Sequence, residues 1–353
     1  MKALVLAGGS GTRLRPFSYS IPKQLMPVAN RPVLLHCLES IRETGVVDVG
    51  VIVGQGAAAI EAAIGDGSAL DLRITYIHQD LPRGLAHCVT ISRDFLGDDD
   101  FLMYLGDNVL VGGIDEVADR FRANRPAAQL LVTKVTNPSD YGIAEVDADS
   151  RVLRLAEKPG EPRSDLALVG VYLFTPEIHE AVRAIRPSAR GEYEITDAIQ
   201  WLVEHDRPVY ADVFPGYWRD TGQIDDLLDC NRALLGSLTR RVEGDVDAAS
   251  TLVGEVVVES GARVVDSTVI GPSVVGAGTV VQRCAVGPYA SVGRECRLAD
   301  TAIENSILLD HASIHQVRGI TSSVIGSSAV VTAAEAETHQ LVIGDHTRVE
   351  VAA

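Results

Sequence analysis

Short apolar runs alternate with amphipathic stretches along the chain from residue 1 to about residue 238. The apolar runs have the length of buried strands and lie at residues 1–6, 49–53, 74–77, 101–104, 129–135 and 169–174. Residues 34–44 and 114–124, which lie between such runs, are expected to form helices. This alternation predicts an α/β fold class in which helices cover both faces of a βαβ sheet.

The pattern changes after about residue 242, where helix formers become rare and apolar residues recur with a period close to six. The recurring positions are Val258, Val264, Ile270, Val275, Val281, Val286, Val292, Leu298, Ile303, Leu309 and Ile314. A β-sandwich alternates with a period of two and does not hold this spacing, so the pattern favours a hexapeptide parallel β-helix, which usually winds left-handed. Later repeats at 325–326 and 343–345 are expected to cap or cross over the coil, with a loop or short helix at 332–340 between them.

Charge and composition exclude several classes of protein. The 353 residues carry a net charge of −17, which opposes binding to nucleic acid because such binders need a basic face. No apolar run approaches the ~18 residues of a membrane span, so we expect a cytoplasmic, soluble protein without a membrane partner. The five cysteines are widely spaced without a CxxC pair, so we expect reduced, mostly buried thiols.

A glycine-rich stretch follows the first apolar run, where residues 8–13 read GGSGTR, and Lys23 lies ten residues after Arg13. Backbone N–H groups at the end of a strand can close around an anion where no Cβ interferes. The stretch lacks the Gly-Lys-Ser/Thr of a Walker loop and the spacing of a dinucleotide fold. Because Arg13 offers a bidentate fork and Lys23 a mobile point charge, the arrangement indicates a site for a triphosphate.

Two aspartates are candidate magnesium ligands. Asp107 directly follows an apolar run, and Asp220 lies between an aromatic pair and a Thr-Gly turn. Magnesium is commonly held by one or two carboxylates together with water and phosphate, while no His/Cys cluster suggests zinc. Alternatively, Asp107 is an ordinary turn residue that caps the next element and binds no metal.

Glu157 and Lys158 precede Pro159, which keeps Lys158 out of a helix. The glutamate is suited to accept hydrogen bonds from sugar hydroxyls and the lysine to neutralise a phosphate, although a surface ion pair is the alternative. Gln79 is a candidate partner for the edge of a base, with Gly84 admitting the base closely, or else an ordinary loop residue.

Seven motifs, taken together and in their order along the chain, resemble those of the sugar-phosphate nucleotidylyltransferases. The resemblance is strongest to the glucose-1-phosphate thymidylyltransferases of the longer form, which carries a left-handed β-helix after the catalytic domain. The motifs are residues 8–14, 22–24, 105–108, 141–142, 157–159, 194–197 and 218–222. The resemblance implies a Rossmann-like mixed sheet nucleotidyltransferase domain at 1–240 and a left-handed parallel β-helix domain at 241–353. It also implies Mg²⁺, the substrates dTTP (or UTP) and glucose 1-phosphate, and a homo-oligomer, either a trimer or a tetramer. Arg31 replaces a more usual lysine and keeps the charge, while the departure of residues 17–20 from the usual pattern leaves the nucleotide preference open.

The resemblance also implies a role for each matching residue. The nucleotide side would comprise Leu6, Gly8, Gly9, Gly11, Thr12, Arg13, Gln24, Gln79, Pro82, Gly84, Leu85 and Asp107. The sugar phosphate side would comprise Asn108, Tyr141, Gly142, Glu157, Lys158, Val169, Arg190, Thr196 and Trp218. The catalytic residues would be Arg13, Lys23, Lys158 and Asp107, and the metal ligands would be Asp107 and Asp220.

The implied reaction transfers a nucleotidyl group from dTTP to glucose 1-phosphate and gives dTDP-glucose and pyrophosphate. Three alternatives remain at this point: a preference for UTP or GTP, a catalytically silent regulatory subunit, and a second acyltransferase activity in the coil. Silent subunits tend to lose the phosphate-binding cations or a metal ligand, all of which are present here. The acyltransferase alternative rests on four histidines, His311, His315, His339 and His346, while a role in oligomerisation or allosteric binding is favoured for the coil.

Overall fold

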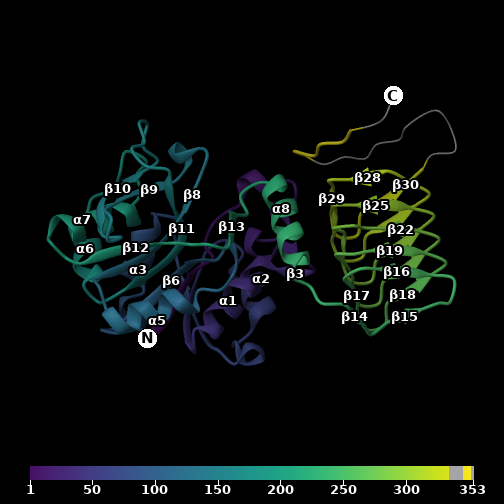
Figure 1. Ribbon diagram of the computed structural model, residues 1–353, viewed down its shortest axis with the longest axis horizontal. Coiled ribbons are helices and arrows are strands. Elements are labelled where there is room, and N and C mark those ends of the chain that lie inside the picture. Colours follow the sequence, from purple (N-terminus) through teal and green to yellow (C-terminus); the bar gives the residue numbers. More distant parts are fainter. Residues whose placement is uncertain (334–344, 351–353) are drawn as a thin grey trace. The chain divides into compact units, whose positions relative to one another are not determined.

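The computed structural model describes residues 1–333 and 345–350. The chain folds into two compact units, each of which combines separate parts of the sequence (Figure 1). The sheet unit comprises Met1–Ser10 and Val33–Asp220, and the coil unit comprises Gly11–Pro32 and the described residues from Thr221 onward. The domain boundary expected at residue 240 stays a prediction.

A mixed sheet of nine strands forms the centre of the sheet unit. Its parallel part comprises β1 (Lys2–Leu6), β4 (Asp48–Val53), β5 (Arg73–His78) and β6 (Phe101–Leu105). Its other strands are β8 (Ala128–Lys134), β9 (Gly142–Val146), β10 (Val152–Glu157), β11 (Leu166–Phe174) and β12 (Val209–Val213). β11 runs antiparallel to β6, so the mixed sheet expected for this α/β fold is confirmed.

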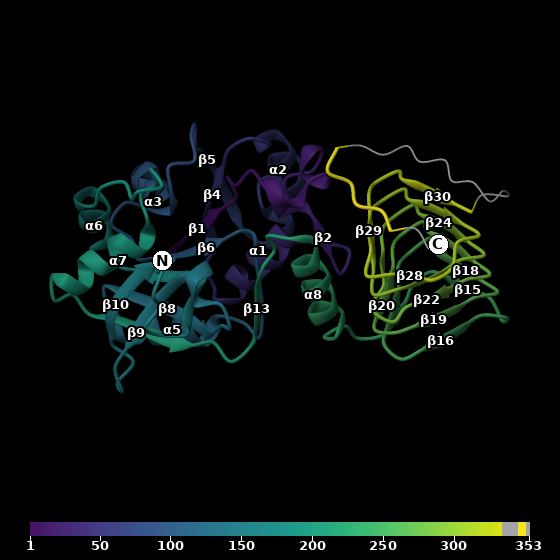
Figure 2. The same cartoon turned by 90° about the horizontal axis from the view of Figure 1, so that it is seen from above.

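Three helices pack together on one face of this sheet: α3 (Leu85–Ile91), α6 (Ile178–Ala184) and α7 (Ile195–Glu204) (Figure 2). α7 buries an apolar stripe with helical spacing, because Ile195, Ile199 and Leu202 lie on one side and join the same core as the strands. The other α-helices of the unit are α1 (Val33–Glu43), α2 (Ala57–Ile64), α4 (Arg93–Leu96) and α5 (Asp115–Asn124). The helices expected at 34–44 and 114–124 are therefore confirmed.

A small antiparallel pair, β7 (Asn108–Val111) and β13 (Tyr217–Asp220), completes the strands of the sheet unit. Two short 3-10 turns, η4 (Ser68–Leu70) and η5 (Pro138–Asp140), lie in its connections. All five cysteines are free and buried, as expected. In the part of the chain that the structure describes, no helix is both long and apolar enough to cross a membrane.

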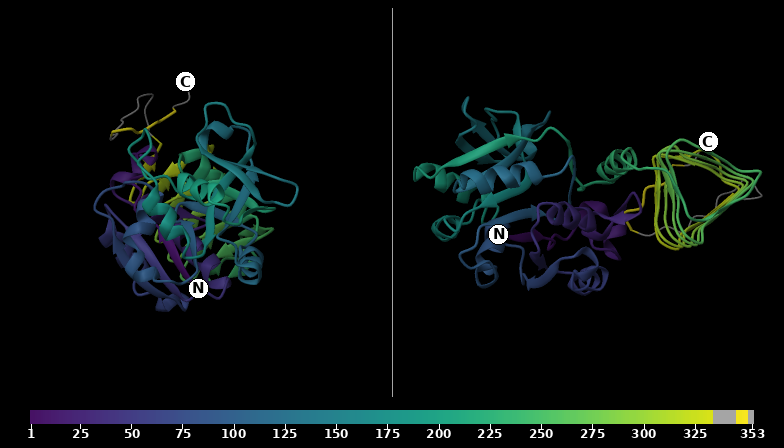
Figure 3. Two further views of the ribbon diagram at one scale, coloured as in Figure 1. Left: turned by 90° about the vertical axis from the view of Figure 1, so that its left-hand side faces the viewer. Right: turned by 60° about the horizontal axis from the view of Figure 1, so that its bottom comes forward.

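Seventeen short strands of the coil unit stack into three parallel sheets that enclose a triangular outline (Figure 3, right). The first sheet comprises β14 (Arg241–Val242), β17 (Val256–Val258), β20 (Ser273–Val275), β23 (Ser291–Val292), β26 (Ile307–Leu308) and β29 (Val324–Ile325). The second comprises β15 (Asp245–Val246), β18 (Arg263–Val265), β21 (Val280–Gln282), β24 (Arg297–Ala299), β27 (Ser313–His315) and β30 (Val330–Thr332). The third comprises β16 (Thr251–Val253), β19 (Thr268–Ile270), β22 (Ala285–Val286), β25 (Ala302–Glu304) and β28 (Ile320–Thr321). The β-helix that the six-residue spacing predicts is confirmed.

Ile270, one of the recurring apolar positions, does not point into the core of the coil, so the expectation for this residue is wrong. Ile270 is 37% exposed, whereas its neighbour Val269 is fully buried and joins the core of the coil. Side chains alternate across a strand, and Val269 is the central residue of β19, so the six-residue spacing slips by one position at this corner. The repeat at 325–326 lies at the end of β29, while residues 343–344 of the other late repeat and residues 334–340 of the expected excursion lie outside the described residues. His339 lies outside them as well.

The segment Gly11–Pro32 and the helix α8 (Ile224–Leu235) belong to the coil unit, although the segment comes early in the sequence. The segment contains η1 (Thr12–Leu14), η2 (Phe17–Tyr19) and η3 (Lys23–Leu25), then the hairpin of β2 (Pro27–Val28) and β3 (Arg31–Pro32). α8 begins with a capping box, in which the backbone N–H of Gln223 donates to Asp226.

Candidate active site

The carboxyl ends of three strands of the sheet unit carry residues predicted for the nucleotide side. Gly8 follows β1, Gln79 follows β5 and Asp107 follows β6. The strands are tied together at this edge, since the amide of Gly106 donates to the carbonyl of Leu6 over 3.0 Å. In open α/β sheets, ligands bind beyond the carboxyl ends of the parallel strands. The structure therefore gathers these predicted residues at the edge where such a sheet receives a ligand.

Gln79 lies between the glycine-rich stretch and α3. Its Nε2 lies 3.1 Å from Nδ1 of His87 and 3.3 Å from Sγ of Cys88, while its Oε1 faces Gly8. Burial, helped by the charge of Arg83, lowers the pKa of His87, so its ring is neutral near pH 7 and can accept a hydrogen bond. Burial raises the pKa of Cys88 to about 12. The Gln79 amide is thus held by uncharged neighbours, in an orientation suited to a fixed hydrogen-bonding role.

Gly84, predicted to admit a base, has another neighbour in the structure. A Cβ at this position would lie 2.4 Å from the backbone oxygen of Tyr193, and φ is +98°. Tyr193 also receives a hydrogen bond from Ala86 and donates one to the carbonyl of Arg83. Gly84 is therefore required for the loop before α7 to pack against the start of α3, and its contact with a base stays a prediction.

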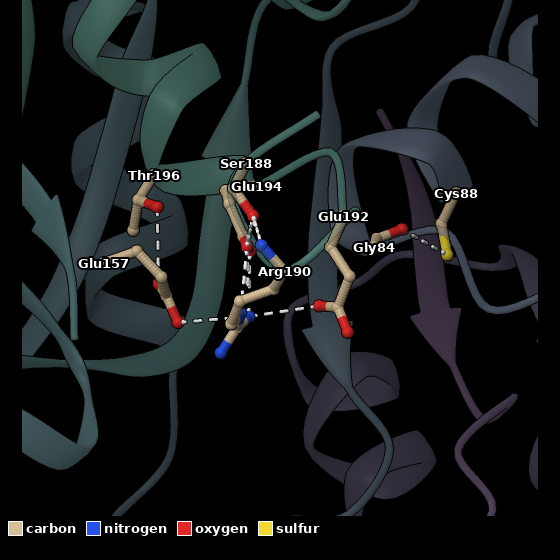
Figure 4. Close-up of polar contacts among 8 residues, drawn as sticks. All are labelled: Gly84, Cys88, Glu157, Ser188, Arg190, Glu192, Glu194 and Thr196. Carbon is tan, nitrogen blue, oxygen red and sulfur yellow. Dashed lines mark hydrogen bonds and ion pairs between the residues drawn. The ribbon is translucent and has the colours of Figure 1, made fainter. Parts of the chain in front are cut away.

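Arg190 lies in the loop before α7, among the carboxylates of Glu157, Glu192 and Glu194 (Figure 4). Its Nη2 lies 3.0 Å from Glu192, 3.1 Å from Glu194 and 3.7 Å from Glu157. Glu194 is only 4% exposed and also accepts a hydrogen bond from Ser188 over 2.8 Å. A buried carboxylate needs such partners, so Glu194 fixes the guanidinium beside Glu157.

Glu157 lies at the end of β10, next to the first turn of α7. Thr196 donates a hydrogen bond to its Oε2 over 3.3 Å. Burial, and secondarily the charge of Glu194, raises the pKa of Glu157, while Arg190 is among the groups that oppose the shift. A Cβ on Gly142 would lie 3.1 Å from Glu157 and 2.9 Å from Thr196, so a side chain there would crowd both groups.

Lys158 is connected to Asp107 through a continuous series of contacts in the sheet unit. The backbone N–H of Lys158, in a left-handed conformation at φ 42°, donates to the carbonyl of Tyr141 over 3.0 Å. The rings of Tyr141 and Trp218 meet edge to face at 5.4 Å, and Trp218 Nε1 donates to Asn108 over 2.8 Å. Asn108 in turn donates to Asp107 over 3.0 Å. Predicted residues from both substrate sides are thus brought into one network.

Of the two predicted metal ligands, Asp107 lies in the turn between β6 and β7, and Asp220 is the last residue of β13. Asp220 pairs with Asn108 across β13 and β7, so it lies opposite the residue that follows Asp107. Among residues 1–333 and 345–350, no group of three or more His, Cys, Asp or Glu side chains is placed to hold a metal. A pair of carboxylates fits the sparse protein ligation of magnesium and does not fit zinc, which takes three or four nitrogen or sulfur ligands.

Five predicted residues, Gly11, Thr12, Arg13, Lys23 and Gln24, lie in the coil unit, while Gly9, Pro82 and Leu85 lie in the sheet unit. Gly11 has φ +62°, and a Cβ there would lie 2.8 Å from Cβ of Lys23, so the bare glycine lets η1 and η3 approach each other. Arg13 and Lys23 are therefore carried by one short folded segment. Gln24 in this segment and Val169 in the sheet are buried, so their predicted ligand contacts stay predictions.

Residues 2–237 match the family model described as nucleotidyl transferase. The chain belongs to the nucleotidyl transferase family. It is 54% identical over 353 residues to a glucose-1-phosphate thymidylyltransferase of Streptomyces griseus, with 99% of both chains covered. The corresponding enzyme of Streptomyces antibioticus is 52% identical over 354 residues, with 99% of both covered. A crystal structure from Bacillus anthracis, in complex with a sucrose, is 30% identical with a TM-score of 0.62 and covers 65% of this chain and 94% of its own. The resemblance drawn from the motifs is confirmed.

Several side chains that hold predicted site residues of this nucleotidyl transferase in place were missed by sequence reasoning. His87 and Cys88 lie on the first turn of α3 and hold Gln79, and Ser188 and Glu192 hold Arg190 or its partner Glu194. The sequence could have indicated Ser188 and Glu192, because each lies two positions from Arg190 in a short loop and is polar. No pattern in the sequence pointed to the contact of Gln79 with α3.

Proposed function

We propose that this nucleotidyl transferase transfers a thymidylyl group from dTTP to glucose 1-phosphate and releases pyrophosphate. The observation that carries the proposal is the contact series from Lys158 to Asp107, which joins residues predicted for the sugar phosphate to a residue predicted for the nucleotide. The sequence identity of 54% and 52% to the two Streptomyces thymidylyltransferases, over nearly the whole chain, supports the choice of substrates.

The proposed step is a single in-line displacement at phosphorus. An oxygen of the sugar phosphate forms a bond to the α-phosphorus of dTTP, and the bond from that phosphorus to the bridging oxygen of the β-phosphate breaks. Pyrophosphate leaves with the electron pair. Since the attacking oxygen is already an anion, no proton has to be removed and no general base is needed, so catalysis depends on positioning and on stabilising charge.

Bringing the two anions together is the main electrostatic cost of this step. Two like unit charges 4 Å apart repel by about 4 kcal/mol at an effective dielectric near 20, so the site has to supply positive charge. Lys158 would neutralise the sugar phosphate, while Arg13 and Lys23 would hold the phosphates of the nucleotide. Arg190 lies among the carboxylates of Glu157, Glu192 and Glu194, so we assign it to orienting Glu157.

Glu157 is proposed to accept hydrogen bonds from the sugar hydroxyls. Its Oε2 already accepts from Thr196 and its Oε1 faces Arg190, so the carboxyl plane is fixed before a sugar arrives. Preorganised acceptors of this kind reduce the entropy lost on binding.

Asp107 and Asp220 would hold a magnesium ion, because two carboxylates, one in the turn before β7 and one at the end of its partner strand β13, suit the sparse protein ligation of this ion. When bound, magnesium would neutralise phosphate charge and so lower the electrostatic cost described above. Asn108 would keep the Asp107 carboxylate oriented, since it donates to that side chain while accepting from Trp218.

Pyrophosphate release tests the proposal. The purified protein is incubated with magnesium, glucose 1-phosphate and each of dTTP, UTP, GTP, CTP and ATP in parallel. Because a single methyl group distinguishes thymine from uracil, we expect dTTP to exceed UTP by about 10- to 200-fold in kcat/KM. A preference for UTP or GTP would overturn the choice of nucleotide but keep the reaction. Silence with all five nucleotides, across several sugar phosphates, would contradict the proposal and favour a regulatory subunit.

A further inference from the structure

The segment Gly11–Pro32 carries Arg13 and Lys23, and we call it the phosphate-binding segment. One buried side-chain amide on α8 joins this segment to the stacked strands of the coil. Asn231 is fully buried, and its Oδ1 accepts hydrogen bonds from the backbone N–H of Ala29 over 2.8 Å and from Ser291 Oγ over 2.6 Å. Its Nδ2 donates to the carbonyl of Tyr289 over 3.3 Å. A single side chain therefore connects the turn of the β2–β3 hairpin with the start of β23 in the coil.

The turn that Asn231 contacts is strained. Ala29 and Asn30 both have positive φ, at 48° and 62°, in a two-residue connection where glycine or asparagine is usual. The side chain of Asn30 also donates to the carbonyl of Val292 over 2.6 Å. Non-glycine residues persist in this region when surrounding contacts hold them, and here those contacts come from α8 and the coil.

Apolar contacts reinforce the same junction. Leu235 of α8 packs in one buried cluster with Val257 and Val274 of the coil, and Ala29 and Tyr289 pack against this cluster. At the other end of the segment, Phe17 lies against Gly326, because a Cβ on that glycine would be 3.5 Å from the ring. The segment that carries Lys23 is thus fixed to the coil on both sides of this lysine.

We propose that Asn231 is a positioning residue for the phosphate-binding segment, through which the coil sets the placement of Arg13 and Lys23. This inference rests on the proposed function, in which those two cations hold the nucleotide phosphates. The segment consists of 3-10 turns and two-residue strands, so it has little regular structure of its own. Since small misplacements of groups that bind a substrate can lower rates up to 100-fold, loosening the segment should be visible in catalysis.

The first test compares three variants of the full chain. Asn231→Ala removes all three hydrogen bonds, and the milder Ser291→Ala removes one of them. The control Ser267→Ala removes a buried hydroxyl that bonds Val265, Val281 and Cys284, away from the first sheet of the coil, whose strand β23 contacts the segment. We expect KM for dTTP to rise about tenfold or more in Asn231→Ala, with less change in Ser291→Ala, while KM for glucose 1-phosphate and the control stay near wild type.

The second test separates positioning from general destabilisation. Because Arg13 and Lys23 are assigned to the phosphates, Asn231→Ala should weaken binding of dTTP much more than binding of dTMP, and adding Lys23→Ala should cost less in the double variant than alone. Equal weakening of both nucleotides, or fully additive effects, would overturn the proposal.

Hydrogen exchange distinguishes failure of this inference from failure of the proposed function. Asn231→Ala should accelerate exchange of the Ala29 amide, whatever the substrate of the protein, and Ser267→Ala should not. Faster exchange in a protein that is silent with every nucleotide would overturn the proposed function and, with it, the assigned cations. Unchanged exchange in an active enzyme would overturn the positioning role alone.

Discussion

The sheet unit and the coil unit bury polar side chains in different ways. In the sheet unit, Glu194 is nearly inaccessible and Glu157 lies beside it, so two carboxylates share the neighbourhood of one arginine. In the coil unit, buried polar side chains include the hydroxyl of Thr279, which donates to a backbone carbonyl, and that of Ser291, which donates to the buried amide of Asn231. Uncharged groups that are hydrogen-bonded in this way cost little free energy to bury. Buried charges cost more, because only well-placed partners of opposite charge or hydrogen-bond donors offset the loss of water.

The comparison indicates what each unit contributes. The sheet unit buries the carboxylate of Glu194 and partly buries that of Glu157, and charges in such surroundings interact more strongly than charges in water. The coil repeats neutral hydrogen bonds and apolar rows, an arrangement that provides a rigid support. Variants in the apolar rows of the coil should therefore affect stability more than catalysis, whereas variants among the charged groups of the sheet unit should affect catalysis.

The largest effect is expected from Lys158→Ala, and Asp107→Asn should behave similarly. Each removes a contact assigned to the transition state, so kcat should fall at least ~100-fold in steady-state assays. Lys134→Ala, which removes an exposed lysine at the end of β8, is the matched control. Rates near wild type for Lys158→Ala would remove this residue from the reaction.

A smaller effect is expected from Gly142→Ala. The added methyl group would press on Thr196 and Glu157, so KM for glucose 1-phosphate should rise about tenfold while KM for dTTP changes little. Gly160→Ala is the control, because a Cβ there meets nothing within 4 Å. Equal behaviour of the two variants would contradict the placement of the sugar phosphate.

The same comparison explains how much of the molecule the sequence predicts. Strands, helices and the β-helix follow from local periodicity, and the motif order indicated the family. The pairing of Gly84 with Tyr193 and the bonds of Asn231 could not be foreseen, because each joins residues far apart in the chain. The error at Ile270 arose for a different reason, since a period of six does not specify which residue of a three-residue strand points inward.

In the coil, Ile303→Val should reduce stability without affecting catalysis. Ile303 is buried in the apolar row, and removing one methylene from a packed core costs about 0.5–1.5 kcal/mol. Denaturant unfolding should show this loss, with kcat at 25 °C unchanged. A fall in kcat/KM as large as that of Gly142→Ala would contradict the purely supporting role of this apolar row.

The smallest effect concerns the pH dependence of stability. The pKa of Glu157 is raised in the folded protein, so the native state binds this proton more tightly than the unfolded chain. Stability contributed by the protonated carboxyl is therefore lost as pH rises above the ordinary glutamate pKa of about 4.3 and through the raised folded value. In thermal melts, Glu157→Gln should lose less stability than wild type over this window, and a greater loss in the variant would contradict the assignment.

The central claim is a direct transfer between two bound anions, and the configuration at phosphorus tests it most directly. The enzyme is given glucose 1-phosphate and one diastereomer of dTTP with sulfur on the α-phosphorus, and the product is analysed by phosphorus NMR. A single in-line displacement predicts inverted configuration at the α-phosphorus. Retention would require two displacements through a covalent nucleotidyl intermediate on the protein, and would contradict the account.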